Sequence, residues 1–368
     1  MKKILYVTTV SSTINVFLIP HINRLIAEGY KVDIACSIDQ SISKNMLNSV
    51  KLHKINFSRN PLNIKNIMAF KEMKLLQNIE KYDVIHVHTP VASFITRAAL
   101  KNYKVKVIYT SHGFHFYKGS PKINWIIYYP IEKIAAKWTD RIITINNEDL
   151  EHARGFKLRN HGDVYLMNGV GIDPDKYIVK DFNKEIYREK IGVMKDNFMI
   201  LILAELNKNK NHMQIIKALS NMNNKSKIKV ICAGKGPLEN KLKKKIKKLG
   251  LENNIKFIGF RDDVKELIEC CDCIALFSKR EGLGKCLLEG MIAKKVLIST
   301  NTRGASTIIK NQENGFLVDL DDYQNTIEVI NSLIDNKFLV KSITKNSEKN
   351  ISKYLLENVL KQVVEYHK

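Results

Sequence analysis

The chain has 368 residues, of which 45% are hydrophobic, so it is long enough for two globular domains with full cores. No stretch approaches the roughly 20 apolar residues of a membrane-spanning helix, and six cysteines in a chain of this size do not predict a disulfide framework, which indicates a reducing cytosol. A net charge of +23 predicts anionic partners.

The positive charge is concentrated in two blocks, residues 44–137 and 207–248, each with about twelve more Lys and Arg than Asp and Glu. The first block suits a membrane surface or an anionic lipid, and the second suits a diphosphate. A general abundance of lysine explains the first block equally well.

In chain order, residues 4–7 predict a strand, 16–28 a helix and 32–36 a second strand. This is the opening βαβ unit of a nucleotide-binding domain. It lacks Gly-x-Gly-x-x-Gly, so no dinucleotide site is predicted. The first residues do not read as a signal peptide, because the apolar run is short and polar residues follow it.

Four histidines follow in the next two strand regions. His86 and His88 share one face of a strand at 84–88, and with no third ligand nearby we interpret them as strand-end residues rather than a metal pair. A strand at 107–111 then ends in a turn that carries His112 and His115.

Residues 123–138 are apolar and aromatic, with lysines on one helical face. Trp, Tyr and Lys together are typical of a membrane interface, although a helix that covers the sheet is the alternative. Pro130 predicts a break into two short helices.

A strand at 141–145, a helix capped by Asn146 and a strand at 164–167 complete the first half. Turn formers at 168–174 predict a boundary near residue 178. The strand and helix alternation then restarts with strands at 198–204, 228–233 and 255–257, and the tail at 351–364 predicts a helix. We expect the clustered Cys270, Cys271 and Cys273 to pack in the core, since three such residues are too few for a structural zinc site.

The stretch from Ser278 to Thr300 organises the second half. It predicts a turn after a strand at 273–277, a helix at 285–293 and a strand at 296–299. Glu281 lies in the turn and Glu289 lies one helical turn in, facing the same crevice at the carboxyl ends of the strands. A helix start suits a phosphate and carboxylates bind sugar hydroxyls, so this segment supplies an anion site and two carboxylates that suit a sugar.

This segment resembles the Glu-x7-Glu signature of glycosyltransferase family 4, which comprises retaining glycosyltransferases of the GT-B fold. Within that family, the chain most resembles capsular and exopolysaccharide glycosyltransferases. Further blocks resemble the family in the right order: His112-Gly113, Asn168-Gly169-Val170, Lys210-Asn211-His212 and Gly234-Lys235-Gly236-Pro237. The chain departs from the family at Ser11-Ser12-Thr13 in place of a Gly-rich loop, at Glu205 near the place of an arginine, and at Thr307 in place of a glutamate.

The resemblance implies an α/β fold with two Rossmann-like domains facing a central cleft. Residues 1–178 would form the acceptor-binding domain, with a C-terminal helix of about 350–368 crossing back to it. Residues 179–349 would form the nucleotide-sugar-binding domain.

The resemblance also implies transfer of a sugar from a nucleotide-diphosphate sugar, with UDP favoured, to an acceptor hydroxyl with retention and without a metal or other cofactor. Glu281 and His112 would be catalytic, and Glu289 would bind the ribose. The other expected donor-binding residues are Lys210, Gly282, Leu283, Gly284, Lys285, Phe260, Arg261 and Gly234, and the expected acceptor-side residues are His115, Tyr117 and Lys118.

The expected acceptor is a polyprenyl-diphosphate-linked glycan of capsule, exopolysaccharide or O-antigen synthesis. The protein would then be cytoplasmic and peripheral at the inner face of the membrane, held by its basic, aromatic first domain. Two hypotheses of other classes are a UDP-sugar 2-epimerase of the same fold and a basic nucleic-acid-binding protein. Against the second, the basic residues of the block at 207–248 are not interleaved with stacking aromatics and no nucleic-acid motif is present, so no nucleic-acid partner is expected.

Overall fold

The computed structural model describes residues 1–368, which form two compact units. The first comprises Met1–Gly171 and Leu356–Lys368, and the second comprises Ile172–Leu355. The division lies before residue 178, because Pro174–Tyr177 packs on a helix of the second unit through a hydrogen bond from Tyr177.

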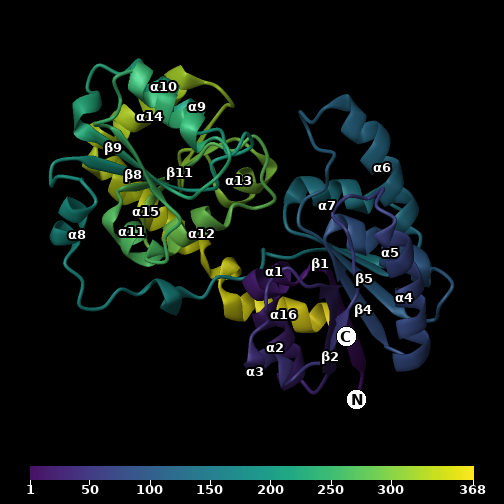
Figure 1. Ribbon diagram of the computed structural model, residues 1–368. Coiled ribbons are helices and arrows are strands. Elements are labelled where there is room, and N and C mark those ends of the chain that lie inside the picture. The colour runs from purple at the N-terminus through teal and green to yellow at the C-terminus, as the bar shows by residue number, and fades with distance from the viewer. The chain divides into compact units, whose positions relative to one another are not determined.

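The first unit is built on a seven-stranded parallel sheet of order β3-β2-β1-β4-β5-β6-β7 (Figure 1). Its strands are β1 (Lys3–Val10), β2 (Lys31–Ser37), β3 (Leu52–Lys54), β4 (Val84–His88), β5 (Lys106–Ser111), β6 (Arg141–Thr144) and β7 (Asp163–Leu166). Its helices are α1 (Ser11–Thr13), α2 (Ile19–Ala27), α3 (Lys44–Leu47), α4 (Lys65–Glu80), α5 (Pro90–Leu100), α6 (Lys122–Ala136), α7 (Asn147–Arg154) and α16 (Leu356–His367). A π-helical turn at Ile14–Leu18 joins α1 to α2.

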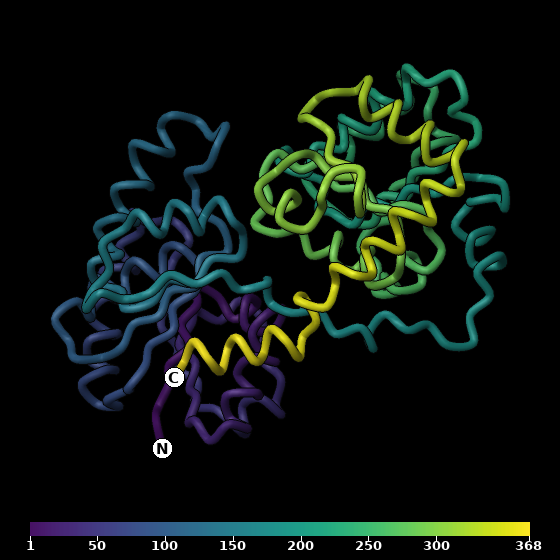
Figure 2. Tube along the Cα trace, turned by 180° about the vertical axis from the view of Figure 1, so that it is seen from behind, coloured from purple at the N-terminus to yellow at the C-terminus, as the bar shows by residue number.

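The central strands β1, β4 and β5 are buried on both faces, which is typical of a parallel sheet covered by helices on both sides. One face, with Leu5, Ile85 and Val107, packs in a single core with residues of α4, α5, α6 and α7. The alternation of a strand places Tyr6, His86 and His88 on the other face. There the C-terminal helix α16 packs on α2, and Figure 2 shows it against the N-terminal part of the chain.

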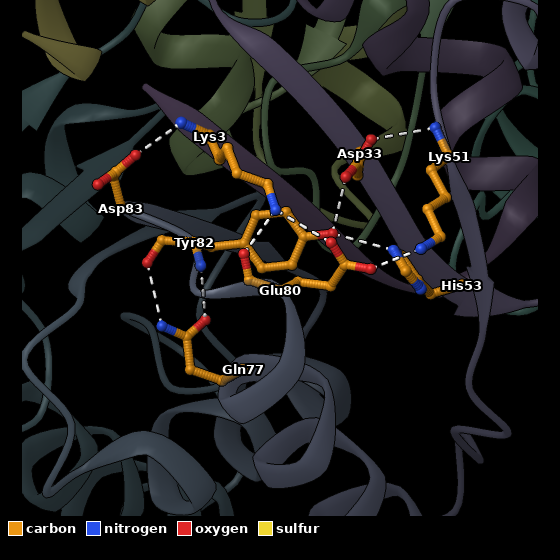
Figure 3. A network of polar contacts seen from close by, with 8 residues as sticks. All are labelled: Lys3, Asp33, Lys51, His53, Gln77, Glu80, Tyr82 and Asp83. Atoms are coloured by element: carbon orange, nitrogen blue, oxygen red, sulfur yellow. Dashed lines mark hydrogen bonds and ion pairs between the residues drawn. The ribbon is translucent and has the colours of Figure 1, made fainter. Parts of the chain in front are cut away.

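A polar network lies at the amino-terminal edge of this sheet (Figure 3). Glu80, the last residue of α4, bonds to Lys51 at 2.5 Å and to Lys3 at 3.0 Å, and these two contacts lower its pKa to about 2. Tyr82, just before β4, donates to Asp33 of β2 at 2.8 Å. These contacts tie together the starts of β1, β3 and β4, and they leave the opposite, carboxyl-terminal edge to the loops that carry the predicted site.

The second unit repeats the design with a six-stranded parallel sheet of order β10-β9-β8-β11-β12-β13. Its strands are β8 (Phe198–Leu203), β9 (Ile228–Ala233), β10 (Ile255–Gly259), β11 (Cys273–Leu276), β12 (Val296–Thr300) and β13 (Phe316–Val318). Its helices are α8 (Lys184–Lys190), α9 (Met213–Ser220), α10 (Glu239–Lys248), α11 (Val264–Cys270), α12 (Lys285–Ile292), α13 (Arg303–Ile308), α14 (Tyr323–Asp335) and α15 (Lys337–Asn350). The strands and helix predicted between 273 and 300 are confirmed. All six cysteines are free and buried.

The predicted break at Pro130 is wrong, because α6 is continuous from Lys122 to Ala136. Proline removes one N–H and disturbs the carbonyl four residues earlier, that of Ile126. Pro130 and Ile126 are both exposed, so water can satisfy the freed carbonyl and the helix continues. None of the helices combines the length and the apolar composition needed to cross a bilayer.

A buried ion pair fixes α6 to α5. Arg97 is fully buried and donates from Nη2 to Glu132 at 2.8 Å, while its guanidinium lies 4.1 Å from the ring centre of Tyr109. Tyr109 also donates to Glu132. Removing one partner leaves a charge buried without compensation, which is strongly destabilising.

We therefore expect Glu132→Ala to lower the free energy of unfolding of the first unit by about 3 kcal/mol. Urea unfolding followed by tryptophan fluorescence measures this, because the two tryptophans of the chain, Trp125 and Trp138, both lie in the first unit. The control is Glu151→Ala, which removes an exposed pair with Arg154 and should cost under about 0.5 kcal/mol. Equal losses in the two variants would contradict the assignment.

Candidate active site

The second sheet reverses its strand order between β8 and β11, and open α/β sheets bind ligands outside the carboxyl ends of the strands at such a point. The loop after β8 carries Lys210 and the loop after β11 carries Glu281. Lys210 Nζ lies 2.5 Å from Glu281 Oε1, and both side chains are largely buried. The structure thus brings together a cation and a carboxylate that lie far apart in sequence.

The two loops are also joined through their backbones. Lys279 N donates to Asn209 O at 2.7 Å, and Asn209 Nδ2 donates to Arg280 O at 3.0 Å. Within the first loop, Lys210 N donates to the side chain of Asn207. These hydrogen bonds fix the positions of the two loops that carry Lys210 and Glu281.

Helix α12 begins directly after this turn, and its start has no side-chain cap. Its N-cap residue is Gly284, with φ +89, a left-handed conformation that glycine adopts without strain. Gly304 packs against the turn so closely that a Cβ there would lie 2.7 Å from Leu283 N. The first N–H groups of a helix have no intrahelical partner and its dipole favours an anion, so Gly284 and Lys285 offer an anion site beside Lys210.

Glu289, one turn into α12, is buried and is held by two donors. Tyr177 donates its hydroxyl to Glu289 Oε1 at 2.7 Å, and Lys285 Nζ lies 3.1 Å from the same oxygen. Burial and the adjacent carboxylate raise the pKa of Tyr177, so Tyr177 remains a donor. Both donors bond to Oε1, which leaves Oε2 for a ligand.

The predicted base-binding segment lies after β10, two strands from β8. Phe260 is 71% exposed, whereas the guanidinium of Arg261 bonds to Asp263, which also accepts from Tyr187. Phe260 is therefore the member of this pair that is open to a ligand. Gly234 follows β9, and a Cβ there would lie 2.0 Å from Ala204 O, so this position requires glycine.

In the first unit, His112 follows β5 directly and is half-buried. Its Nε2 lies 3.2 Å from Nδ1 of His88, the last residue of β4. Burial lowers the pKa of His112 to about 4, so the imidazole is neutral at pH 7.

The predicted acceptor-side residues lie on the loop between β5 and α6. The ring of His115 packs on Tyr128 of α6 at 4.7 Å between ring centres in a tilted arrangement, and its carbonyl accepts from Asn124. Lys118 N donates to Glu148 of α7. The N–H of Tyr117 donates to Ser120 within the loop, whereas His115 and Lys118 contact the two flanking helices.

Two residues that hold predicted site residues, Tyr177 and His88, were not predicted in that role from the sequence. The signal for His88 was its place at a strand end beside the strand of His112; no comparable signal marked Tyr177. Asp39 was also missed. It accepts from the N–H of Ser12 at 2.9 Å and from its hydroxyl at 2.7 Å, so a carboxylate already occupies the start of α1. The loop that replaces the family's Gly-rich segment is therefore unsuited to a phosphate.

Residues 3–146 match the glycosyl transferase 4-like family, and residues 183–350 match the glycosyl transferases of group 1. The chain is 35% identical over 333 residues to the putative glycosyltransferase EpsD of Bacillus subtilis strain 168, covering 87% of this chain and 84% of the relative. It is 26% identical to the Escherichia coli UDP-Gal:alpha-D-GlcNAc-diphosphoundecaprenol alpha-1,3-galactosyltransferase, covering 85% and 82%.

Among solved structures, the chain is similar to Anabaena Alr3699/HepE in complex with UDP and glucose. The TM-score is 0.81 at 20% identity, covering 100% of this chain and 99% of that one. This likeness shows the fold, and the expected GT-B fold with two Rossmann-like units is confirmed. From the similarity to EpsD over most of both chains and the two family matches, the protein belongs to the glycosyltransferases of the group 1 and glycosyl transferase 4-like families.

Proposed function

We propose that the protein transfers a hexosyl or N-acetylhexosaminyl group, with retention at the anomeric carbon, from a nucleotide-diphosphate sugar to a hydroxyl of a lipid-linked glycan. The observation that carries the proposal is the Lys210–Glu281 pair beside the start of α12, at the switch point of the second sheet. It combines a cation, helix N–H groups and a carboxylate, which are the groups that a departing diphosphate and a sugar require.

In this proposal Lys210 and the N–H groups of residues 283–285 stabilise the charge that develops on the leaving diphosphate. Glu281 orients the donor sugar, Glu289 accepts from the ribose hydroxyls, and Phe260 stacks on the base. His112, as a neutral imidazole, donates to a substrate hydroxyl. The leaving phosphate takes the acceptor proton, so this chain supplies charge stabilisation and no general base, and the protein needs no divalent metal.

UDP is the favoured carrier, because the solved relative from Anabaena binds UDP and the relative from Escherichia coli uses UDP-Gal. A polyprenyl-diphosphate-linked glycan is the favoured acceptor. The Escherichia coli relative acts on GlcNAc-diphosphoundecaprenol, and a Campylobacter jejuni relative, 29% identical over 44% of this chain, also acts on a diphospho-undecaprenol substrate. The similar Staphylococcus aureus CapM supports a role in capsular or exopolysaccharide synthesis.

The test is product formation from UDP-, GDP- and TDP-sugars, each with and without a polyprenyl-diphosphate-linked sugar acceptor. We expect one UDP-sugar to yield free UDP and a lengthened acceptor with the anomeric configuration retained, and we expect the rate to be unchanged in excess EDTA. An altered sugar still joined to UDP would instead indicate an epimerase. No turnover of any donor, or an inverted product, would overturn the proposal.

A hydroxyl contact between Tyr177 and Glu289 gives a prediction for donor binding. We expect Tyr177→Phe to raise KM for the donor about fivefold at unchanged kcat, because Glu289 loses one of the two donors that orient it. With a donor whose ribose lacks its hydroxyls, wild type and variant should have the same KM. A fivefold difference that persists with this deoxyribose donor would show that Tyr177 does not act through the ribose.

Part of the proposal is attachment to an anionic membrane through the first unit. Helix α5 packs between α4 and α6, and both of these neighbours expose apolar side chains among exposed lysines. The exposed apolar residues include Ile67, Met68, Leu75 and Ile79 on α4 and Ile123, Ile126, Ile127 and Ile134 on α6. Apolar residues that insert at the headgroup level, flanked by lysines, are typical of helices that lie on anionic bilayers.

We expect the protein to sediment with phosphatidylglycerol-containing vesicles at low salt but not with pure phosphatidylcholine vesicles. Ile126→Asp should weaken this binding about tenfold, because a carboxylate then meets the bilayer surface. Ile186→Asp, at an equally exposed isoleucine of the second unit, is the matched control and should leave binding unchanged. Failure to bind anionic vesicles would remove the membrane from the proposal and leave the transfer reaction standing.

A further inference from the structure

Two histidines at the ends of neighbouring strands form a hydrogen-bonded pair in the first unit. His88 ends β4 and His112 follows β5, and the two strands pair in parallel with His88 opposite Thr110. The rings stack with centres 5.5 Å apart, and His88 Nδ1 lies 3.2 Å from His112 Nε2. His88 is fully buried, whereas His112 is half-buried and therefore within reach of a ligand.

The two nitrogens share one proton, so the pair has two arrangements. If His88 donates, its own Nε2 is an acceptor and His112 carries its proton on Nδ1. If His112 donates from Nε2, the proton of His88 must lie on Nε2 instead. Nε2 of His88 is buried with no hydrogen-bond partner. A buried N–H without an acceptor is rarer in native structures than an under-satisfied acceptor, so the first arrangement is favoured.

We propose that His88 is a positioning residue that holds His112 in the Nδ1–H tautomer and thereby presents an N–H donor, not a lone pair, to the substrate. This inference rests on the proposed function, in which His112 contacts a substrate hydroxyl. Which ring nitrogen carries the proton is set by the bond that the other nitrogen makes, and for His112 that bond goes to His88.

The neighbouring His86 shows that this role is specific to His88. His86 lies on the same face of the same strand and is equally buried, but both of its nitrogens bond elsewhere, to Thr110 at 2.7 Å and to His367 of α16 at 3.0 Å. The rings of Tyr6 and His86 pack on His88 at 5.3 and 4.2 Å between centres, which fixes the plane of the His88 ring. His88 therefore has one polar contact, and it is directed to the site.

The test is the tautomer of His112, read by long-range ¹H–¹⁵N correlation on histidine-labelled protein at pH 7.5 without substrate. In wild type we expect the proton on Nδ1. In His88→Leu, which fills the space without a donor, we expect Nε2–H to become populated. His88→Asn keeps an N–H donor near the place of Nδ1 and should preserve the wild-type tautomer. His86→Asn, the matched control, should also preserve it.

Turnover provides the second readout. We expect His88→Leu to lower kcat/KM about tenfold and His88→Asn to restore it to within about threefold, as for loss and recovery of one oriented hydrogen bond. A wild-type His112 protonated on Nε2, or a His88→Leu variant with unchanged tautomer and unchanged turnover, would overturn the proposal. If wild type transferred no sugar, the proposed function would fail, while the tautomer measurement would still decide whether His88 sets the state of His112.

Discussion

Lys210→Met is expected to lower kcat about 10³-fold and to weaken the binding of UDP at least tenfold, because the charge of Lys210 acts on the departing diphosphate. The two effects belong together, since a diphosphate is present both in bound UDP and in the transition state. Steady-state kinetics with whichever nucleotide sugar proves to be the donor measures kcat, and calorimetric titration with UDP measures the affinity for UDP.

Glu281→Gln separates binding from catalysis. The carboxylate of Glu281 lies 2.5 Å from Lys210 and competes with the diphosphate for it. The neutral amide of the Glu281→Gln variant should therefore leave UDP binding unchanged or make it tighter. We expect kcat to fall about 10²-fold, because the donor sugar loses a charged hydrogen-bond acceptor. A parallel loss of UDP affinity and kcat in Glu281→Gln would contradict this division of roles.

Lys208→Met is the control in the same loop. Lys208 is exposed and lies two positions before Lys210 on the same loop. Its replacement removes a charge but leaves the hydrogen bonds between the two loops in place. We expect a change below threefold. If Lys208→Met matched the loss in Lys210→Met, the diphosphate would be bound by the loop as a whole or by Lys208, and the pairing with Glu281 would not identify the catalytic cation.

Most of the fold could be predicted from the sequence, because most strands are buried and appear as short apolar runs between turn formers. The helix of the organising stretch was predicted to within one residue of α12, since Gly284 and the apolar face of 287–291 mark its start and its buried side. The break at Pro130 was wrong because a proline breaks a helix most strongly where water cannot reach the freed carbonyl, whereas Pro130 and Ile126 lie on the exposed side of α6.

The sequence could predict those site residues whose type and motif suggest the chemistry. It could not predict contacts that form only because the fold brings distant residues together. Lys210 and Glu281 were predicted separately from their blocks, but their direct contact follows from the switch between β8 and β11. Tyr177 and His88 act through another residue. Such roles depend on a distance between atoms far apart in sequence, which composition and spacing do not contain.

The first unit is expected to lose most of its stability between pH 6.5 and pH 5. Burial lowers the pKa of His21, His112 and His367 to about 4, and it lowers the pKa values of His86 and His88 well below their ordinary range. A histidine whose folded pKa is depressed binds its proton more readily in the unfolded chain, so stability is complete above about pH 6.5 and falls as pH falls.

The size of the effect follows from these values. A histidine with a pKa of about 4 in the folded state and about 6.5 in the unfolded state costs about 2 kcal/mol at pH 5. His21, His112 and His367 alone therefore remove about 6 kcal/mol, which is comparable with the whole stability of a typical domain. Urea unfolding at pH 7.5, 6 and 5, followed by the fluorescence of Trp125 and Trp138, reports this unit alone.

The second unit provides an internal comparison, because His212 is its only histidine. Burial also lowers the pKa of His212 to about 4, so this unit should lose about 2 kcal/mol at pH 5, a third of the loss that three histidines cause in the first unit. Far-UV circular dichroism of the whole chain should therefore retain a second transition at lower pH than the fluorescence change.

Carboxylates do not explain an acid transition in this window. The pKa of Glu80 is lowered to about 2 by Lys51 and Lys3, so its contribution is present above about pH 4.5 and is lost only below it. His367→Gln tests the assignment to histidine directly. It removes one buried group that takes up a proton on unfolding, so the slope of unfolding free energy against pH should fall by up to about 1.4 kcal/mol per pH unit between pH 6 and pH 5. If the slope were unchanged in both His367→Gln and His21→Gln, groups other than the buried histidines would cause the loss of stability of the first unit at low pH.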